Sequence, residues 1–377
     1  MPSQVHSFRK EIKRVVSGLV ARLWRRPRIS PTELHELRPQ RILVVRPHNQ
    51  MGDMVCATPT FRALREAYPE AEIALVCAPV NHDVVRHSPH LDHVLLFDKR
   101  ACTRLGPLVE FIGRMRKFDA ELAFVLNSVS YSVTSAALAA VSGARWIVGC
   151  DSDPFGFDIS RHAYSLVMPS FPVMDRHAID HHLAPLEAVG LGTRDRTTLV
   201  VPSVAELERA AEIATTIPGT GDLWIMHPGA AKTANLWPTD RFAEIAKRLV
   251  AAGRRVLVLQ GPADAEVMIR FRSAMEQLQP EGPGAWRELP TVTVGVCAAL
   301  LKRADRFLCN DTGLMHVAGA VGAPTLALFG PTDPAHWAPR TRNLHVLRGE
   351  DRTPGSLDVE LVWRAWNALE TTSEMEA

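Results

Sequence analysis

The chain alternates short apolar runs with longer amphipathic stretches, in two separate series. Uninterrupted apolar runs are typical of strands that are covered on both faces, and the amphipathic stretches between them predict helices. The pattern therefore predicts an α/β protein with two Rossmann-like, doubly wound domains that face an interdomain cleft. The predicted strands are 42–45, 73–76, 94–97, 122–126 and 146–148 in the first series, and 224–226, 256–259, 306–309 and 325–329 in the second.

Two interruptions of this alternation suggest the domain organisation. Residues 150–173 are rich in Pro, Gly and Asp, so no strand is predicted there. Residues 217–222, Ile-Pro-Gly-Thr-Gly-Asp, have the composition of a linker. We predict four segments: a basic amphipathic N-terminal segment 1–38, an N-terminal domain 39–215, a C-terminal domain 216–350, and a C-terminal helix and tail 351–377.

Composition and charge narrow the class of protein. With 46% hydrophobic and 22% charged residues, the 377-residue chain can bury two sizeable cores. A net charge of only +2 argues against nucleic acid as the main partner. There is no apolar stretch of ~18 residues and no signal peptide, which predicts a cytoplasmic protein. The scattered cysteines predict buried free thiols in a reducing compartment; they are Cys56, Cys77, Cys102, Cys150, Cys297 and Cys309.

The N-terminal segment differs from the rest of the chain. Eight Lys and Arg residues lie between Arg9 and Arg28, against the single acid Glu11. Apolar residues recur among them at helical spacing over 5–28, which predicts a basic amphipathic helix suited to an anionic membrane face. The alternatives are a helix packed on the protein's own surface and a disordered tail.

The loop after the first predicted strand is a candidate for catalysis. In open α/β sheets, ligands bind at the carboxyl ends of strands. Gly52 permits a tight turn there, and Asp53 follows it at the start of a helix. Its carboxylate is a candidate general base for an attacking hydroxyl, or it merely caps the helix. Arg46, Asn49 and Gly52 are candidates for binding the acceptor or supporting the loop.

Two further loops are candidates for binding a phosphate. After strand 224–226, small residues precede Lys232, whose charge can meet a phosphate oxygen; the alternative is a surface loop pinned by Trp237. After strand 306–309, Asp311, Thr312 and Gly313 fall where a helix starts.

The start of that helix predicts an anion site. Free backbone N–H groups and the positive end of the helix dipole favour a diphosphate. Thr312 adds a hydroxyl donor, and His316 lies one turn further on. The alternative for His316 is a semi-buried structural imidazole. Asp311 would repel a phosphate, so it caps the helix, holds the loop or meets sugar hydroxyls.

The absence of two phosphate-binding motifs excludes two other kinds of chemistry. The chain has no G-x-x-x-x-G-K-[ST] loop and no G-x-G-x-x-G fingerprint, which excludes P-loop phosphoryl transfer and dinucleotide binding of that kind. We interpret Asp151-Ser-Asp153 as a solvated loop and the pair His181-His182 as a helix surface feature. We predict no metal site and no cofactor, the nucleotide-sugar being a substrate.

Taken together, the three loops and their neighbours resemble glycosyltransferase family 9, the family of the bacterial lipopolysaccharide heptosyltransferases. The resemblance runs from about Arg41 to Pro339. The matching segments are Arg41-Ile-Leu-Val-Val-Arg46, Met51-Gly-Asp53, Thr58-Pro59, Ala63-Leu-Arg-Glu-Ala-Tyr-Pro69, His227-Pro-Gly229, Trp237-Pro238, Arg241-Phe242, Asn310-Asp-Thr-Gly-Leu-Met-His316 and Leu328-Phe-Gly-Pro-Thr-Asp-Pro334.

The resemblance implies a GT-B fold, with the acceptor on the N-terminal domain and the nucleotide-sugar on the C-terminal one. It implies that Asp53 is the catalytic base of an inverting, metal-independent transfer, and that Asp264 lies near the acid that takes ribose hydroxyls. The residues that match the family's diphosphate loop are Thr312, Gly313, Leu314 and His316. In one departure, Asn235 stands where the family often has a Lys, and Lys232 lies three positions away. Lys232 then reaches the phosphate from a reshaped loop, or donor binding differs.

We therefore predict a transferase that moves a heptose or related sugar from a nucleotide diphosphate sugar, ADP-heptose being one candidate, to a lipopolysaccharide-core or other cell-envelope glycan. The partners are the donor, a glycan or glycolipid acceptor and, through residues 5–28, the inner membrane surface. The alternatives are a non-catalytic nucleotide-sugar or glycan-binding protein, and a nucleotide-sugar epimerase.

Overall fold

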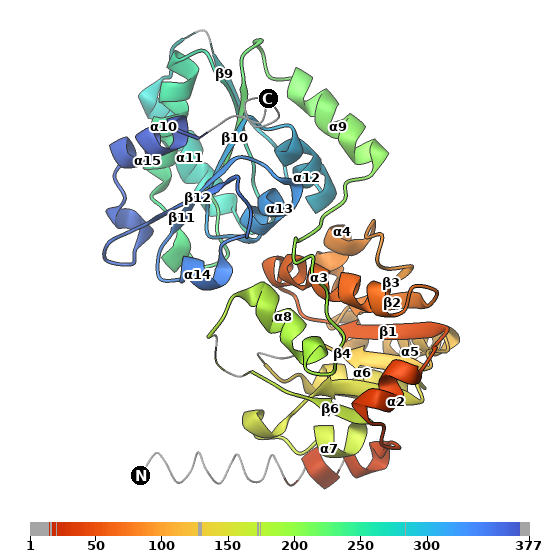
Figure 1. Cartoon of the computed structure of the whole chain (residues 1–377). Coiled ribbons are helices and arrows are strands. Elements are labelled where there is room, and N and C mark those ends of the chain that lie inside the picture. Colours follow the sequence, from red (N-terminus) through yellow and green to blue (C-terminus); the bar gives the residue numbers. More distant parts are fainter. Residues whose placement is uncertain are drawn as a thin grey trace. The chain divides into compact units, whose positions relative to one another are not determined.

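The computed structural model describes residues 15, 17–19, 21–126, 130–171, 173, 175–282 and 284–369. The chain forms two units (Figure 1). The first comprises Met1–Gln50 and Cys56–Arg196, and the second comprises Met51–Val55 and Thr197–Ala377. Within each unit the α/β class predicted from the sequence is confirmed.

The first unit contains a six-stranded sheet in the order β3-β2-β1-β4-β5-β6. All its strand pairs are parallel. Each of its central strands is buried along nearly its whole length, which explains why they read as continuous apolar runs. The strands are β1 (Arg41–Arg46), β2 (Glu72–Cys77), β3 (His93–Leu96), β4 (Leu122–Val125), β5 (Trp146–Cys150) and β6 (Leu166–Met168).

Helices precede, connect and follow these strands. The helix α2 begins with a capping box in which Ser30 and Glu33 bond each other's backbone N–H, followed by Pro31 in the first turn. The helices are α2 (Pro31–Glu36), α3 (Met51–Ala67), α4 (His82–Val85), α5 (Leu105–Lys117), α6 (Val133–Val141), α7 (Ser160–Ala163) and α8 (Ala178–Glu187), with 3₁₀ turns η1 (Arg22–Trp24), η2 (Pro79–Asn81), η3 (Ala101–Thr103) and η4 (Asp153–Phe155).

The second unit repeats this plan with the order β12-β11-β10-β7-β8-β9. Its strand pairs are also all parallel. The helices α10, α11 and α15 lie on one side of this sheet and α12 and α13 on the other (Figure 1). The strands are β7 (Leu223–His227), β8 (Arg255–Val258), β9 (Ala285–Glu288), β10 (Arg306–Asn310), β11 (Thr325–Phe329) and β12 (Leu344–Arg348). The helices are α9 (Val204–Thr215), α10 (Thr239–Ala251), α11 (Ala265–Leu278), α12 (Val294–Lys302), α13 (Gly313–Val321), α14 (Pro334–Trp337) and α15 (Val359–Asn367), with η5 (Thr233–Asn235) and η6 (Pro354–Ser356).

Both sheets have the strand order of a Rossmann fold. Numbered within its own unit, each sheet runs 3-2-1-4-5-6, with the order reversing between β1 and β4 and between β7 and β10. Ligands of such sheets bind outside the carboxyl ends of the strands at this switch point. The loops after β1, β7 and β10 are therefore the places where function is expected.

The structure places the boundary between the units before α9, not at residue 216 as the linker composition predicted. The reason is packing, because α9 lies against α12 of the second unit. Glu206 of α9 is only 6% exposed and bonds the backbone N–H and hydroxyl of Ser203. A Cβ at Gly295 of α12 would lie 1.8 Å from the Oε1 of Glu206, so the two helices approach closely at this glycine.

The described parts of the two terminal segments also belong to the units rather than standing apart. Ala21 and Leu34, from predicted segment 1–38, are both 0% exposed. In α15, Val362 and Trp366 join the core of the second unit. Residues 1–14, 16, 20 and 370–377 lie outside the described residues.

The sequence missed three strands, namely β6, β9 and β12. The strand β6 spans only Leu166–Met168, inside the stretch where no strand was predicted. The other two are Ala-Trp-Arg-Glu and Leu-His-Val-Leu-Arg, whose burial is only partial. All three lie at sheet edges, where a strand needs no continuous apolar run.

Two other sequence predictions can be compared with the structure. All six cysteines are free, and all but the half-buried Cys102 are buried. Among the described residues, no helix combines the length and the apolar character needed to cross a membrane.

Candidate functional site

At the switch point of the second sheet, one buried amide joins the two phosphate-binding candidate loops. Asn310 ends β10, beside the end of β7, and is 0% exposed. Its Oδ1 accepts a hydrogen bond from the Trp237 backbone N–H at 3.0 Å. Its Nδ2 donates to the backbone carbonyls of Pro228 at 2.9 Å and Gly229 at 3.3 Å. The loop after β7 is thereby fixed against the end of β10.

Trp237 fixes the far end of the same loop. Its indole is 0% exposed within the core of the second unit, and its Nε1–H donates to the Leu357 carbonyl at 2.9 Å. The alternative of a loop pinned by Trp237 is thus right about the packing. A pinned loop also holds backbone groups in place at the switch point, so the packing supports a binding role. The following helix α10 begins at Thr239, with Pro238 as its N-cap.

Asp311 lies next to this pinned loop. Asn235 Nδ2 donates to its carboxylate at 2.9 Å and to its backbone carbonyl at 3.2 Å. Burial raises the pKa of Asp311 above its ordinary value, while bonds from the Thr332 and Asn235 side chains and the charge of Lys232 act in the opposite direction. Lys232 is exposed. Asp311 therefore holds the loop through an amide, which is one of the roles predicted for it.

The helix α13 begins at the residue after Thr312. Thr312 is its N-cap, in extended conformation, and makes no side-chain cap hydrogen bond. The first amides of a helix have no intrahelical partner, and they carry the positive end of the dipole. Gly313 and Leu314 present such amides at the switch point. The chemistry suited to this place is the binding of an anion.

His316 lies one turn into α13 and is 5% exposed. Its ring lies edge-on to that of Trp337, with centroids 6.5 Å apart at 80°. The imidazole is thus largely buried within the second unit.

A buried His–Asp pair occupies the next loops of the same unit. His227 ends β7 and Asp264 immediately precedes α11; they are 4% and 5% exposed. His227 Nε2 lies 2.9 Å from Asp264 Oδ2, which also accepts a bond from the Gly261 N–H at 2.6 Å. Burial acts to raise the pKa of Asp264, but the bonds and charge from His227 and the Gly261 N–H outweigh it and the pKa is lowered.

The same pair explains a glycine in the loop after β7. A Cβ at Gly229 would lie 2.2 Å from Asp264 Oδ1. No larger residue fits while His227 holds the carboxylate in place.

In the first unit, the loop after β1 starts from a buried arginine. Arg46 is 4% exposed, and its Nη1 donates to the carbonyl of Leu126, the residue after β4, at 3.3 Å. Its Nη2 lies 3.5 Å from His182 Nε2. Residues 127–129, which continue from β4, lie outside the described residues.

Asp53 lies in the first turn of α3. The N-cap of α3 is Gln50, so Asp53 does not occupy the cap position that was the alternative for it. Gly52 and Asp53 are half-buried and Asn49 is exposed.

Comparison with known proteins identifies the family of this chain. The family model for glycosyltransferase family 9 (heptosyltransferase) matches residues 114–358. This chain belongs to glycosyltransferase family 9. It is therefore a glycosyltransferase, and the predicted family is confirmed.

The relatives are distant in sequence, and two solved structures are similar in fold. An Escherichia coli lipopolysaccharide heptosyltransferase 3 is 21% identical over 295 residues, covering 78% of this chain and 84% of the relative. A family 9 structure from Veillonella parvula has a TM-score of 0.74 at 21% identity, covering 90% of this chain and 98% of that one. The structure of E. coli ADP-heptose LPS heptosyltransferase II has a TM-score of 0.73 at 21% identity, covering 89% and 100%. The GT-B fold is thus confirmed.

Within this family 9 chain, the structure brings together part of the predicted donor set. Asp311 lies within the influence of Lys232, and the α13 start follows it directly. Asp264 is paired with His227 instead. Sequence reasoning missed the roles of Asn310, Asn235 and His227. Asn310 offered a signal, since an amide that directly follows the apolar run 307–309 must find partners when buried.

His181 and Asp151 lie in the first unit, and the candidate donor loops lie in the second. His181 was interpreted as a surface feature, but it is 0% exposed, with Nε2 3.4 Å from Asp175 Oδ1, so that interpretation is wrong. Asp151 Oδ1 accepts bonds from the Asp153 N–H and the Ser160 hydroxyl, as befits a structural loop.

Among the described residues there is no group of three or more His, Cys, Asp or Glu placed to hold a metal. The absence of a metal and of a cofactor stays a prediction.

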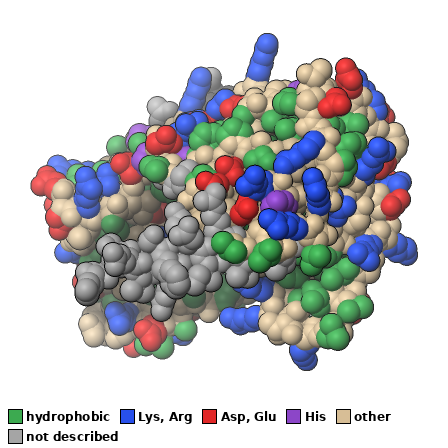
Figure 2. Space-filling model, turned by 90° about the horizontal axis from the view of Figure 1, so that it is seen from below, with side chains coloured by type: hydrophobic (Ala, Val, Ile, Leu, Met, Phe, Trp, Pro, Cys, Tyr) green, Lys and Arg blue, Asp and Glu red, His purple; other side chains and the backbone are tan. Residues whose placement is uncertain are grey.

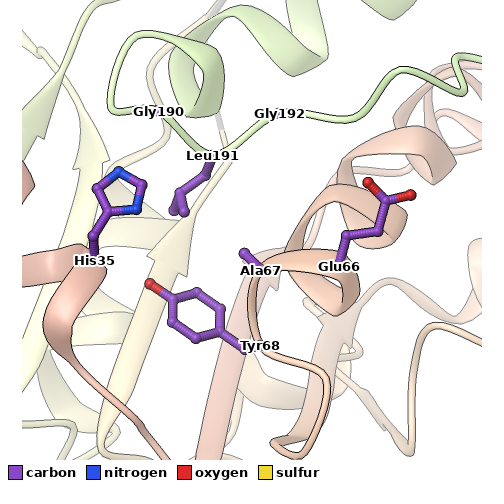
Figure 3. A pocket seen from close by; sticks show the side chains of 7 residues that line it. All are labelled: His35, Glu66, Ala67, Tyr68, Gly190, Leu191 and Gly192. Carbon is purple, nitrogen blue, oxygen red and sulfur yellow. The ribbon is translucent and has the colours of Figure 1, made fainter.

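A pocket of about 230 Å3 in the first unit is structural rather than functional (Figure 3). In Figure 3, His35 and Tyr68 face Leu191. His35 Nε2 bonds the Val189 carbonyl at 2.7 Å, and the Tyr68 hydroxyl donates to the Leu34 carbonyl at 3.3 Å. Burial raises the pKa of Tyr68 to about 12, so it stays a neutral donor. These polar groups already bond the protein's own backbone and hold α2 in place.

Proposed function

We propose that this chain transfers a heptose or related sugar, with inversion and without a metal, from a nucleotide diphosphate sugar to a lipopolysaccharide-core or other cell-envelope glycan. ADP-heptose is the first candidate donor, because one similar structure is named for it. The acceptor class follows from a relative named as a lipopolysaccharide heptosyltransferase. The observation that carries the proposal is the open helix start of α13 at the switch point of the second sheet.

The donor diphosphate would lie against this helix start. The amides of Gly313 and Leu314 would donate to its oxygens, and the Thr312 hydroxyl is not used as a cap. Lys232, exposed on the neighbouring loop, would add a mobile positive charge. His316 would contribute from the first turn of the helix.

Asp264 has a less direct part in this proposal. It would meet the ribose hydroxyls of the donor through Oδ1, because Oδ2 is bonded to His227 and Gly261. His227 would then fix the direction of the carboxylate. The proposed contact therefore depends on one oxygen of a nearly buried side chain.

Asp53 would act as the general base. The acceptor hydroxyl gives its proton to the Asp53 carboxylate while its oxygen bonds to the anomeric carbon from the face opposite the leaving group. The bond between that carbon and the diphosphate oxygen breaks, and the nucleoside diphosphate leaves with the electron pair. Configuration is inverted in this single displacement. Arg46, Asn49 and Gly52 would support the loop or bind the acceptor.

The place of action would be the cytoplasmic face of the inner membrane, where a lipid-linked acceptor is available. No nucleic acid is proposed as a partner, in keeping with the net charge of +2.

The test compares Asp53→Asn with Asp240→Asn, an exposed acid in the first turn of α10. The donor is first chosen by thermal shift among ADP-, UDP- and GDP-sugars, since a ligand at 100 times its Kd stabilises by about 2.7 kcal/mol. We expect Asp53→Asn to lower turnover by about 10²- to 10⁴-fold with donor affinity unchanged, because only the proton acceptor is lost. Asp240→Asn should change neither quantity.

Other outcomes would favour other functions. Full turnover in Asp53→Asn would remove Asp53 from the mechanism. Conversion of the donor with no acceptor present would indicate an epimerase, and the absence of transfer from any donor that binds would indicate a binding protein.

A further inference from the structure

The described residues between Val15 and Trp24 pack one side against the first unit. Ala21 is 0% exposed in the core of that unit, and Trp24 packs against the same core. The Ser17 hydroxyl accepts a bond from the Asp158 N–H at 3.1 Å. A Cβ at Gly18 would lie 2.9 Å from Asp158 Oδ2, so this side fits closely. The segment thus has a fixed orientation.

The opposite side exposes an apolar stripe. Val15, Leu19 and Leu23 are 57%, 55% and 84% exposed. Val15 and Leu19 are four residues apart, on the same side of a helix, and Leu23 follows in the 3₁₀ turn η1. Such a row exposed to water is unfavourable unless something covers it.

Arginines line a groove that includes Arg22, the neighbour of Leu23 in the chain. Five of them, with His162, line a groove of about 660 Å3; they are Arg22, Arg25, Arg26, Arg28 and Arg161. The guanidinium groups of Arg26 and Arg28 bond backbone carbonyls of Ala140 and of Tyr164 and Arg161, which fixes them in place. Arg22 and Arg25 are exposed, and the side chain of Arg161 is 65% exposed.

Within the described residues, Asp158 pairs with two side chains of the groove. Its Oδ1 lies 3.5 Å from Arg161 Nε, and its Oδ2 lies 3.6 Å from His162 Nε2. This carboxylate does not balance the five guanidinium groups that line the groove. Figure 2 shows one face of the molecule, on which basic side chains are spread with hydrophobic ones between them.

We propose that this face, formed by Val15, Leu19, Leu23, Arg22, Arg25 and Arg161, docks on an anionic phospholipid bilayer. The arginines would meet lipid phosphates while the three apolar side chains enter the headgroup region. A soluble phosphate would neutralise the arginines but leave the apolar row in water. The inference deepens the proposed function, because it names the surface that brings the enzyme to a lipid-linked acceptor, but the docking itself needs no donor.

The experiment measures co-sedimentation of the full chain with vesicles, in the absence of donor and acceptor. We expect binding to phosphatidylcholine vesicles that contain phosphatidylglycerol and little binding to phosphatidylcholine alone. Each arginine near an anionic surface contributes about fivefold to affinity. The triple variant Arg22→Ala, Arg25→Ala, Arg161→Ala should therefore bind about 100-fold more weakly. Its binding should also depend less on salt.

A second variant tests the apolar stripe. Leu19→Ser with Leu23→Ser should weaken binding about tenfold or more at every salt concentration, because insertion is not electrostatic. The matched control is Arg270→Ala, Arg303→Ala, Arg342→Ala, which removes three exposed arginines of the second unit and should bind as the native chain does. Thermal unfolding of each variant checks that it is folded.

Three results would overturn the proposal. The first is native-like vesicle binding by the triple arginine variant, and the second is absence of binding to anionic vesicles. The third is full competition by millimolar inorganic phosphate at constant ionic strength, which would indicate a phosphate site. Transfer to a delipidated, soluble acceptor, measured separately, tests the proposed function, so failure of docking and failure of catalysis are distinguished.

Discussion

At the scale of single residues, Asp311 is the most unusual member of the candidate site. It lies directly before a helix start suited to an anion, yet it carries a carboxylate of its own. Burial raises its pKa, and the partner that bonds it directly on the neighbouring loop is the neutral amide of Asn235. Lys232 acts on it by charge and is itself exposed. Ionisation of Asp311 therefore lowers the stability of the folded state.

This gives a pH-dependent prediction for Asp311→Asn. A group whose pKa is raised by folding stabilises the protein fully below its unfolded pKa, about 3.9, and loses that contribution as pH rises through the folded pKa. The variant does not titrate at this position. We expect its free energy of unfolding, relative to the native chain, to rise as the pH is raised above about 4. Urea unfolding at several pH values measures this difference. Asp240→Asn should show no such trend, and a flat difference for Asp311→Asn would contradict the prediction.

Residue types at the site could be predicted from the sequence, but their pairings could not. Thr312 and Gly313 follow a predicted strand directly, so local order placed them at a helix start. The contacts of Asn310 join positions more than 70 residues apart in the chain. The His227–Asp264 pair likewise depends on two loops meeting. Such contacts arise only when the sheet is assembled.

At the scale of elements, the two neighbouring helices α12 and α13 have different N-caps. Thr293 caps α12, with its hydroxyl accepting a bond from the Val296 N–H at 3.3 Å. Thr312 occupies the same position in α13 and makes no such bond. One threonine therefore serves stability, while the hydroxyl of the other is available for a ligand.

Replacing each threonine by valine should separate these two roles. We expect Thr293→Val to lower the free energy of unfolding by about 1 kcal/mol and to leave donor affinity unchanged. Thr312→Val should leave stability nearly unchanged and weaken donor binding about tenfold, because one hydrogen bond to a charged oxygen is lost. Chemical unfolding and calorimetric titration with the donor measure the two quantities. Equal donor affinity in both variants would argue against a diphosphate at α13.

Element prediction succeeded where burial is complete. The central strands β1, β4, β7 and β10 each contain an apolar run of three or more buried residues, and all four were predicted. The edge strands β6, β9 and β12 are held by pairing with one neighbour, which no local pattern reveals. Since function lies at the switch points in the middle of each sheet, the missed edges did not obscure the site.

At the scale of the whole molecule, the boundary at residue 197 changes what counts as an independent piece. Four residues of α9 are buried, namely Glu206, Ala210, Ile213 and Ala214. A fragment of residues 197–369 should unfold cooperatively. A fragment of residues 216–369 should be less stable by about 3 kcal/mol or more, since α12 loses its cover. Urea unfolding followed by circular dichroism compares them, and equal midpoints would show that α9 is dispensable.

The N-terminal segment must also be treated as part of a unit. Deleting residues 1–35 would remove Ala21, Ile29 and Leu34, all of which are buried. Such a deletion would open the core of the first unit as well as removing the basic face. Point substitutions at exposed positions are the cleaner way to study the segment.

The repeated strand order has a consequence for how this enzyme can change over time. The two sheets wind alike, yet the loop after β1 offers an acid and the loops of the second sheet offer amides. Under the proposed function, the loops that select the acceptor and the loops that select the donor follow strands of two different sheets with the same strand order. Mutations that retune one specificity can therefore accumulate without disturbing the other, except at Met51–Val55, which follow β1 but belong to the second unit.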